Sequence, residues 1–356
     1  MARPTEPHVK PTADRWGRFG DLCEDLSPDG FAVVDRRVAK LHPTIEAHLR
    51  ARLGPAAVMR LDGGEETKRF AVIEEVLRRA QHVSRDGAFV AVGGGALGDV
   101  ATVIAHLLKR GVNLIQVPTT LLAAVDSSIG GKGAINIGAV KNAAGVFHAP
   151  AETWLCGELL DTLPPAQLRD GHVEAWKMAA CLDADLWNRW RKRAPGRVEL
   201  IRESRRLKRA VCARDPLERT GRRVVLNFGH TFGHVLESLS DFRLSHGAAV
   251  RLGVLCALDA GRAVGVTPER VAREVEASFA SLALNGERGP REALARGLAG
   301  SARASLDRLL LADKKTGADG ELRLVLLERL GRARLLAVPP AVWAPLLRSW
   351  RRGERP

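Results

Sequence analysis

Three histidines lie close together in the stretch from Leu226 to Val250, at His230, His234 and His246. His230 and His234 are four residues apart, so on a helix they share one face. Neutral imidazole is the commonest metal ligand in proteins, and the spacing therefore suggests a metal site. Buried structural histidines would give the same pattern, and three histidines at this spacing form no signature by themselves.

A carboxylate is the missing part of such a metal site. Two histidines and one glutamate would leave an open coordination position, as in catalytic zinc centres, and Zn²⁺ and Co²⁺ would both suit these ligands. Several acidic residues of the chain could supply the third ligand. The HExxH pattern of zinc proteases does not occur in the sequence, so the site is not of that kind.

A glycine-rich turn follows an apolar run in the N-terminal half. Residues 87–92 read GAFVAV, a buried-strand pattern, and lead through Gly93–Asp99 into an apolar helix at 100–108. This arrangement lets backbone amides at a helix N-terminus approach a pyrophosphate. The spacing is not GxGxxG, and glycine turns also serve geometry alone. A strand at 31–34 ends at Asp35, which could hold ribose hydroxyls or form a simple turn.

The segment Leu121–Asn142 mixes charged and apolar residues. It contains Asp126, Lys132, Lys141 and Asn142 beside several glycines. Glycine permits close approach of the backbone, and lysines supply charge for a phosphate. A solvated irregular loop is the alternative, but charged groups in such apolar surroundings usually have partners.

The elements around these motifs predict two domains. Apolar patterns predict an α/β nucleotide-binding domain at 1–150 and an all-α metal- and substrate-binding domain, apart from one short hairpin, at 151–356. The expected strands are 31–34, 56–61, 87–92 and 113–117, with the hairpin at 322–327 and 333–338. The expected helices are 63–77, 100–108, 165–182, 189–214, 226–237, 247–264, 268–284, 302–312 and 342–350.

Composition narrows the functional classes. The chain has 356 residues, 46% hydrophobic and 27% charged, as in soluble globular proteins of one or two domains. Neither an apolar run of membrane-spanning length nor a secretory signal is evident, and five scattered cysteines predict a reduced, cytoplasmic protein. The net charge of +14 accompanies only 4% aromatic residues and no tyrosine. This pattern favours anionic small molecules over nucleic acid as partners.

Long motifs give the chain a specific resemblance. GGGALGDV, VPTTLLAAVDSSIGGKGAIN, HVEAWK, LNFGHTFGH and SHGAAV occur in the order and spacing of the 3-dehydroquinate synthases, which are sugar phosphate cyclases. The match runs from about Asp35 to Lys315. The resemblance implies an N-terminal NAD-binding α/β domain, a C-terminal helical domain that carries zinc or cobalt, and a homodimer.

The resemblance also implies an activity. The family contains NAD- and metal-dependent phosphate lyases that cyclise 3-deoxy-D-arabino-heptulosonate 7-phosphate to 3-dehydroquinate and phosphate, a step of the shikimate pathway to the aromatic amino acids. The implied steps are transient oxidation of a secondary alcohol, elimination of phosphate, return of the hydride, and intramolecular aldol closure. In such chemistry the protein mainly orients the reactants and supplies electrostatic stabilisation.

The family's functional positions can be carried over residue by residue. The matching metal ligands are Glu174, His230 and His246. The matching NAD positions are Asp35, Glu65, Lys68, Gly94, Gly95, Asp99, Thr119, Thr120, Lys141 and Thr162. The matching catalytic and substrate positions are Arg110, Asp126, Lys132, Asn142, Lys177, Lys208, Arg223, Asn227, His234, Lys314 and Lys315.

Three departures from the family pattern leave alternatives open. Ala248 replaces the glutamate of the usual HGEAV, VEAWKMA stands where AEVIK and a tyrosine are usual, and the segment from Asp215 to Arg223 is one residue longer. Arg223 and Asn227 favour a substrate with a carboxylate, hence the seven-carbon acid phosphate. The alternatives are a specialised cyclase, acting on an amino analogue or on sedoheptulose 7-phosphate, and a metal-dependent polyol dehydrogenase.

Overall fold

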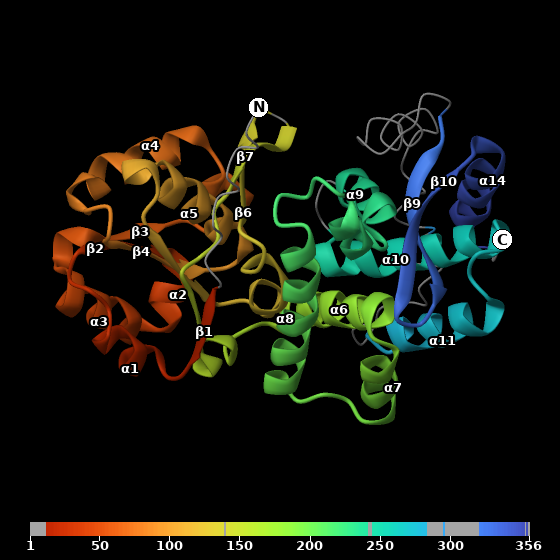
Figure 1. Ribbon diagram of the computed structural model, residues 1–356, viewed down its shortest axis with the longest axis horizontal. Coiled ribbons are helices and arrows are strands. Elements are labelled where there is room, and N and C mark those ends of the chain that lie inside the picture. Colours follow the sequence, from red (N-terminus) through yellow and green to blue (C-terminus); the bar gives the residue numbers. More distant parts are fainter. Residues whose placement is uncertain are drawn as a thin grey trace, which may run out of the picture. The chain divides into compact units, whose positions relative to one another are not determined.

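The computed structural model describes residues 12–138, 140–240, 244–282, 295, 320–352 and 354. These residues form two compact units that divide between Leu163 and Pro164 (Figure 1). The sequence placed the boundary at residue 150, but the strand β8 (Glu152–Leu155) pairs in the sheet of the first unit. The first unit therefore extends past the composition change at Pro150.

A six-stranded parallel sheet is the centre of the first unit, with strand order β1-β8-β5-β4-β2-β3. Every residue of the apolar run in β4 is buried, as expected for a sheet covered on both faces. The four strands expected from the sequence in this region are confirmed, and β1 and β8 are additional. The strands are β1 (Ala13–Trp16), β2 (Gly30–Asp35), β3 (Val58–Leu61), β4 (Ala88–Gly93), β5 (Asn113–Pro118) and β8.

Helices cover both faces of this sheet (Figure 1). Successive residues of β2 point to opposite faces: Phe31 and Val33 pack with α4 and α5, whereas Ala32 and Val34 pack with α1 and α3. The helices are α1 (Phe19–Glu24), α2 (Arg36–Leu41), α3 (Pro43–Leu53), α4 (Phe70–Arg79) and α5 (Gly95–Leu107). The expected helix at 63–77 begins only at Phe70, because Glu65–Thr67 forms a separate 3-10 turn. The helix expected at 100–108 begins earlier, directly in the glycine turn.

The glycine-rich segment 121–142 is more ordered than a solvated loop. It begins with a π-helical turn at Ala123–Ser127 and continues into an antiparallel hairpin of β6 (Lys132–Ile137) and β7 (Val140–Phe147). Gly133 lets β6 lie against α5, because a Cβ there would stand 2.5 Å from the Cβ of Thr102. The missing side chains at such glycines removed the alternation by which a strand is recognised in sequence.

Helices and one hairpin make up the described part of the second unit. The helices are α6 (Pro165–Leu182), α7 (Ala184–Lys192), α8 (Arg197–Arg214), α9 (His230–Leu239), α10 (His246–Ala263), α11 (Glu269–Ala280) and α14 (Pro340–Arg351). The expected hairpin is confirmed as β9 (Leu322–Arg329) and β10 (Arg332–Val338). The single basic helix expected at 189–214 is two helices, α7 and α8. The helix expected at 302–312 lies outside the described residues.

Two details of the second unit matter for the site. The helix expected at 226–237 begins only at His230, because Arg222–Asn227 forms a 3-10 helix and Gly229 has a left-handed backbone with φ of 81°. The apolar faces of α9, α10, β9 and α14 form one core, with Phe232 against Trp350. None of the helices searched among the described residues has the length and apolarity that a membrane span requires.

Candidate active site

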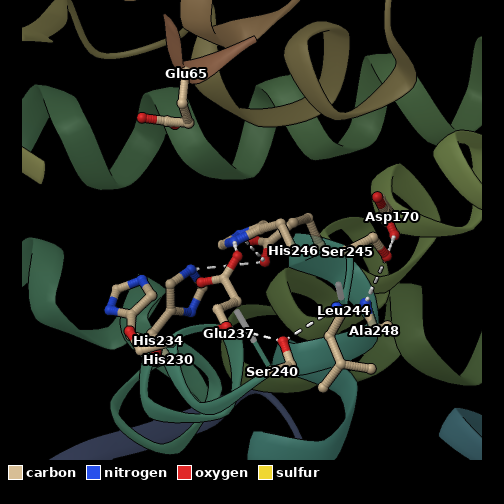
Figure 2. A network of polar contacts seen from close by, with 12 residues as sticks. Glu65, Asp170, His230, His234, Glu237, Ser240, Leu244, Ser245, His246 and Ala248 are labelled. Atoms are coloured by element: carbon tan, nitrogen blue, oxygen red, sulfur yellow. Dashed lines mark hydrogen bonds and ion pairs between the residues drawn. The ribbon is translucent and has the colours of Figure 1, made fainter. Parts of the chain in front are cut away.

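Glu174, His230 and His246 come together in the second unit. They lie on three different helices, α6, α9 and α10, and each histidine is the first residue of its helix. One ligand atom from each lies within 4.8 Å of the others. The Oε1 atom of Glu174 stands 3.7 Å from Nε2 of His230 and 3.6 Å from Nε2 of His246. Figure 2 shows the two imidazoles and the polar contacts around them.

The surroundings of Glu174 fit a cation. The residue is fully buried, Lys177 on the next turn of α6 binds its Oε2, and its Oε1 has no hydrogen-bond partner among the described residues. Burial alone would raise the pKa of Glu174, but Lys177 and His246 hold it below the usual value. A buried carboxylate oxygen without a hydrogen bond is costly. A metal ion between the carboxylate and the two imidazoles would satisfy it.

The second nitrogen of each imidazole also has an acceptor nearby. Nδ1 of His230 lies 3.4 Å from the carbonyl oxygen of Phe228, and Nδ1 of His246 lies 3.3 Å from Oε1 of Glu237 on α9. Contacts of this kind fix the orientation and tautomer of a ligating histidine. Glu237 was not among the residues expected from sequence, although its position seven residues after His230 places it two turns along the same helix.

Two carboxylates change the protonation of His246. Burial would lower its pKa, but Glu174 and Glu237 raise it to about 10. The two carboxylates thus favour the protonated imidazole in the metal-free protein. A metal ion that binds Nε2 must displace this proton, so its affinity falls as the pH is lowered.

Other candidate residues of the second unit surround this cluster or lie on neighbouring elements. The ring of His234 is centred 5.3 Å from that of His230 and 6.4 Å from that of His246. Lys208 on α8 and Arg223 in the 3-10 helix are both buried, and these two elements contact α6. Asn227 is the last residue of that 3-10 helix. Lys314 and Lys315 lie outside the described residues.

Asp215 organises the loop that leads to Arg223. Its Oδ1 accepts hydrogen bonds from the backbone N–H groups of Arg219 and Thr220 at 2.8 and 3.0 Å. Its Oδ2 accepts from those of Arg222 and Arg223 at 3.1 and 3.4 Å. Burial would raise the pKa of Asp215, but these backbone bonds lower it. The length of this loop is visible in the sequence, whereas the role of Asp215 in folding it is not.

Several of the predicted cofactor residues lie at or directly after the carboxyl ends of the parallel strands in the first unit: Asp35, Gly94, Gly95, Thr119 and Thr120. Asp35, Gly93 and Pro118 end neighbouring strands β2, β4 and β5. Gly94 precedes α5 and provides no side-chain cap, which leaves the first amides of the helix for another acceptor. A small pocket opens here, lined by Ala91, Gly93, Gly94, Gly95, Gly98, Gln116, Val117, Pro118, Ala123, Ser127 and Ser128.

Three threonines and Asp35 make local bonds at or near this edge. Oδ1 of Asp35 accepts from the amides of Arg37 and Val38 and so caps α2, in agreement with the turn interpretation. The amide of Thr119 donates to the carbonyl oxygen of Gly93 at 3.0 Å, and Oγ1 of Thr120 accepts from the amide of Ala123 at 3.1 Å. Thr162 contacts His42, with 3.0 Å between Oγ1 and Nε2.

A polar network joins α5 to the β6–β7 hairpin. The buried Nζ of Lys68 lies 2.6 Å from Oδ2 of Asp99 and donates to Oδ1 of Asn142 at 2.8 Å. Asn136 accepts from the amide of Asn142 at 2.9 Å and donates to Oε2 of Glu65 at 3.0 Å. The structure thus joins Asn142, expected at the substrate, to residues expected at NAD. Asn136 was not expected from sequence.

The remaining candidates of the first unit are spread over other elements. Arg110 lies at the opposite end of α5 from the glycine turn, where Lys109 and Arg110 both have positive φ, 51° and 65°. Such strain in residues other than glycine is often found at functional positions. Asp126 belongs to the π-helical turn, Lys132 is the first residue of β6, and Lys141 is exposed on β7. Their roles stay predictions.

Family models match both units. The N-terminal model of 3-dehydroquinate synthase matches residues 58–170, and the C-terminal model matches residues 171–316. The 3-dehydroquinate synthase of Bradyrhizobium sp. strain BTAi1 is 38% identical over 317 residues, which cover 85% of this chain and 81% of that protein. The chain therefore belongs to the 3-dehydroquinate synthase family, as its motifs predicted.

Solved structures of related cyclases share the fold. The 2-epi-5-epi-valiolone synthase of Streptomyces hygroscopicus subsp. jinggangensis 5008, solved with NAD⁺ and Zn²⁺, is 23% identical with a TM-score of 0.81 and 99% coverage of both chains. A 2-deoxy-scyllo-inosose synthase, solved with carbaglucose-6-phosphate, NAD⁺ and Co²⁺, is 24% identical with a TM-score of 0.79 and 96% coverage of both chains. These likenesses confirm the predicted fold, an α/β domain followed by a helical domain.

Proposed function

We propose that the protein is an NAD- and metal-dependent phosphate lyase that converts 3-deoxy-D-arabino-heptulosonate 7-phosphate to 3-dehydroquinate and phosphate. One observation carries this proposal: in a chain of this family, Glu174 directs a hydrogen-bond-free Oε1 at His230 and His246. The identity to a 3-dehydroquinate synthase, 38%, exceeds the 23% and 24% to the two solved cyclases of other names. This difference favours the acid phosphate over the substrates of specialised cyclases.

Two groups of residues would hold the two cofactors, one for the metal ion and one for NAD. Glu174, His230 and His246 would hold Zn²⁺ or Co²⁺, whose Lewis acidity would lower the pKa of a substrate hydroxyl. The amides at the start of α5, together with the network around Lys68 and Asp99, would hold NAD, which would supply the hydride acceptor and donor.

Basic side chains would bind the anionic substrate. Lys208 and Arg223 would clamp its carboxylate, because buried cations bind carboxylates strongly and arginine does so with two parallel bonds. Lys132 would bind the phosphate. His234, beside His230, would hold a phosphate oxygen or move a proton at its ring nitrogen.

Asp215→Asn tests whether the loop places Arg223 for carboxylate binding. Asparagine presents one acceptor oxygen where the aspartate presents two, so two of the four backbone bonds are lost. We expect a KM about tenfold higher, equivalent to roughly 1.4 kcal/mol, with a smaller change in kcat. Steady-state phosphate release measures both.

A matched control for this loop is Asp183→Asn. Asp183 also accepts a backbone bond, from Leu186 at 2.9 Å, and caps α7. Asparagine caps helices as well as aspartate does, so we expect Asp183→Asn to lose only the ion pair with Arg206, at a cost of less than about 1 kcal/mol, and to leave KM unchanged. An Asp215→Asn protein with the KM of the wild type would show that Asp215 does not act through Arg223.

We also propose that the protein is a homodimer, and β7 supports this proposal. Among the described strands β7 pairs only with β6, so one edge remains without a strand partner. Val140 and Phe147 on β7 are 62% and 40% exposed, and Ile137 on β6 is 50% exposed. Exposed apolar side chains on a strand whose edge lacks a strand partner favour association with another chain.

Val140→Asp is expected to weaken the dimer, because it replaces an exposed apolar side chain of β7 by a charge. Sedimentation velocity should show a dimer for the wild type and a concentration-dependent shift to monomer for the variant. Val198→Asp is the matched control, since Val198 on α8 is also exposed, at 51%. A Val140→Asp protein that remains as dimeric as the control would exclude β7 from the interface.

We place the protein in the cytoplasm. All five cysteines lie among the described residues, and all are buried and none forms a disulfide. Burial raises the pKa of the thiols of Cys156 and Cys181 to about 12, so both stay protonated and unreactive. Cysteines without disulfides agree with a reducing compartment, and fractionation of the producing cells would test the location.

The first assay is phosphate release in the presence of NAD and Zn²⁺. The seven-carbon acid phosphate and sedoheptulose 7-phosphate are compared, with absorbance of NADH recorded in parallel. Release from the acid alone, without net NADH, is the expected result. Turnover of sedoheptulose 7-phosphate would instead assign the protein to the cyclitol-forming cyclases. Net NADH with a simple polyol would make it a dehydrogenase.

A further inference from the structure

The first turn of α10, which carries His246, has no acidic residue of its own. The N-terminus of a helix carries partial positive charge and unpaired N–H groups, and an acidic side chain there is stabilising. A capping box would place a glutamate or glutamine three residues after the capping Ser245, at position 248. Ala248 stands there in this chain.

A carboxylate from another helix lies at this turn. Oδ1 of Asp170 on α6 accepts a hydrogen bond from Oγ of Ser245 at 2.7 Å (Figure 2). The same hydroxyl oxygen accepts from the backbone N–H of Ala248 at 3.4 Å and from Nη2 of Arg169 at 3.0 Å. A serine hydroxyl has one donor and two acceptor sites, so all the bonds of Ser245 are used.

The contact between Asp170 and α10 is close. A Cβ at Gly247 would stand 2.7 Å from Oδ1 of Asp170 and closer still to its Cα. The two helices therefore touch at the residue that follows His246. Asp170 is also four residues before Glu174, so both carboxylates lie on one face of α6. One of them faces the two imidazoles, and the other binds the residue before His246.

We propose that Asp170 supplies the carboxylate that the first turn of α10 lacks and, through Ser245, positions His246 against Glu174. Asp170 is a positioning residue, since it contacts neither imidazole directly among its hydrogen bonds. It fixes the start of α10 to the helix that carries Glu174, and Glu237 then fixes the orientation of the ring. This inference rests on the metal site of the proposed function.

The test measures zinc affinity of the metal-free protein by competition with a chromophoric chelator, and the visible absorption of the Co²⁺ form. We expect Asp170→Ala and Ser245→Ala each to weaken zinc binding about 10- to 100-fold, the range for residues that orient a metal ligand. The double variant should bind zinc no less tightly than the weaker-binding single variant, because both substitutions remove the same contact between Ser245 and Asp170. Asp170→Asn keeps an acceptor for Ser245 and should lose less.

Asp259→Asn is the matched control, a buried carboxylate on the same helix that accepts from Nε1 of Trp350 at 2.7 Å. It should lower stability and leave zinc affinity and the Co²⁺ spectrum unchanged. Far-UV circular dichroism checks folding. If Asp170→Ala fails to fold, the zinc affinities of Ser245→Ala and Asp170→Asn test the inference.

The outcomes separate the inference from the proposed function. Wild-type zinc affinity in Ser245→Ala and in the Asp170 variants, or effects of the two residues that simply add, would overturn the inference while the metal site stands. A wild-type protein that binds zinc no better than Glu174→Gln would overturn the metal site itself.

Discussion

Glu174→Gln is expected to abolish tight metal binding and to lower kcat/KM about 1,000-fold. The substitution removes the charged oxygen that faces both His230 and His246 and leaves two neutral imidazoles. The Lewis acid contributes several kcal/mol to reactions of this type, and each 1.36 kcal/mol corresponds to a factor of ten in rate. Phosphate release and zinc competition measure the two losses separately.

The same substitution is also expected to destabilise the metal-free protein. Lys177 is 2% exposed and makes an ion pair with Glu174. Removing one partner of a buried ion pair typically costs about 3–5 kcal/mol, because the remaining charge is left without compensation. Loss of activity in Glu174→Gln alone could therefore reflect partial unfolding, and a second variant is needed to separate the two effects.

Lys177→Met in the Glu174→Gln background provides this separation. Methionine fills a similar volume without charge, and replacing a whole buried ion pair by uncharged residues is often close to neutral. We expect the double variant to unfold within about 1 kcal/mol of the metal-free wild type while metal binding stays lost. Chemical denaturation without metal gives the stability. A double variant that regained zinc affinity would show that Glu174 is not a ligand.

The strands of the first unit could be predicted because each is a short buried apolar run. In β4, for example, the sequence AFVAVG is buried throughout and ends in the glycine turn that opens α5. The same reasoning failed for the β6–β7 hairpin, because its glycines carry no side-chain pattern and β7 is exposed along most of its length. The domain boundary was placed at residue 150, before β8. This strand has only four residues, and helical patterns dominate the sequence that follows it.

The cluster of Glu174, His230 and His246 was predicted by resemblance, whereas the residues that hold it in place could be identified only in the structure. The spacing of His230 and His234 could be read from the sequence, but only His230 belongs to the cluster. His246 and Glu174 complete the cluster from two other helices. Glu237, Asp215 and Asn136 act through hydrogen bonds that depend on how helices and loops meet. Asp170 reaches a residue 75 positions away along the chain, and no sequence period connects the two.

The close crossing of α9 and α10 depends on glycine at position 253. A Cβ there would stand 2.7 Å from the amide nitrogen of Gly233 and closer still to the carbonyl oxygen of Gly229. Both atoms belong to the backbone of α9 or its N-cap, so no flexible side chain can move aside. The two helices would have to separate, and each of them begins with a proposed metal ligand, His230 or His246.

Gly253→Ala is therefore expected to lower both stability and metal affinity, although alanine favours helices by about 1 kcal/mol over glycine. Overpacking typically costs 1–3 kcal/mol or more, and a backbone contact this close puts the net loss near 3 kcal/mol, roughly 6–12 °C in Tm. Gly196→Ala is the matched control, because no atom lies within 4 Å of its Cβ position. A Tm for Gly253→Ala equal to that of Gly196→Ala would mean that α9 and α10 can separate without cost. Reduced stability together with unchanged zinc affinity would mean that the ligands follow the movement, and that the crossing stabilises the fold without setting the distance between His230 and His246.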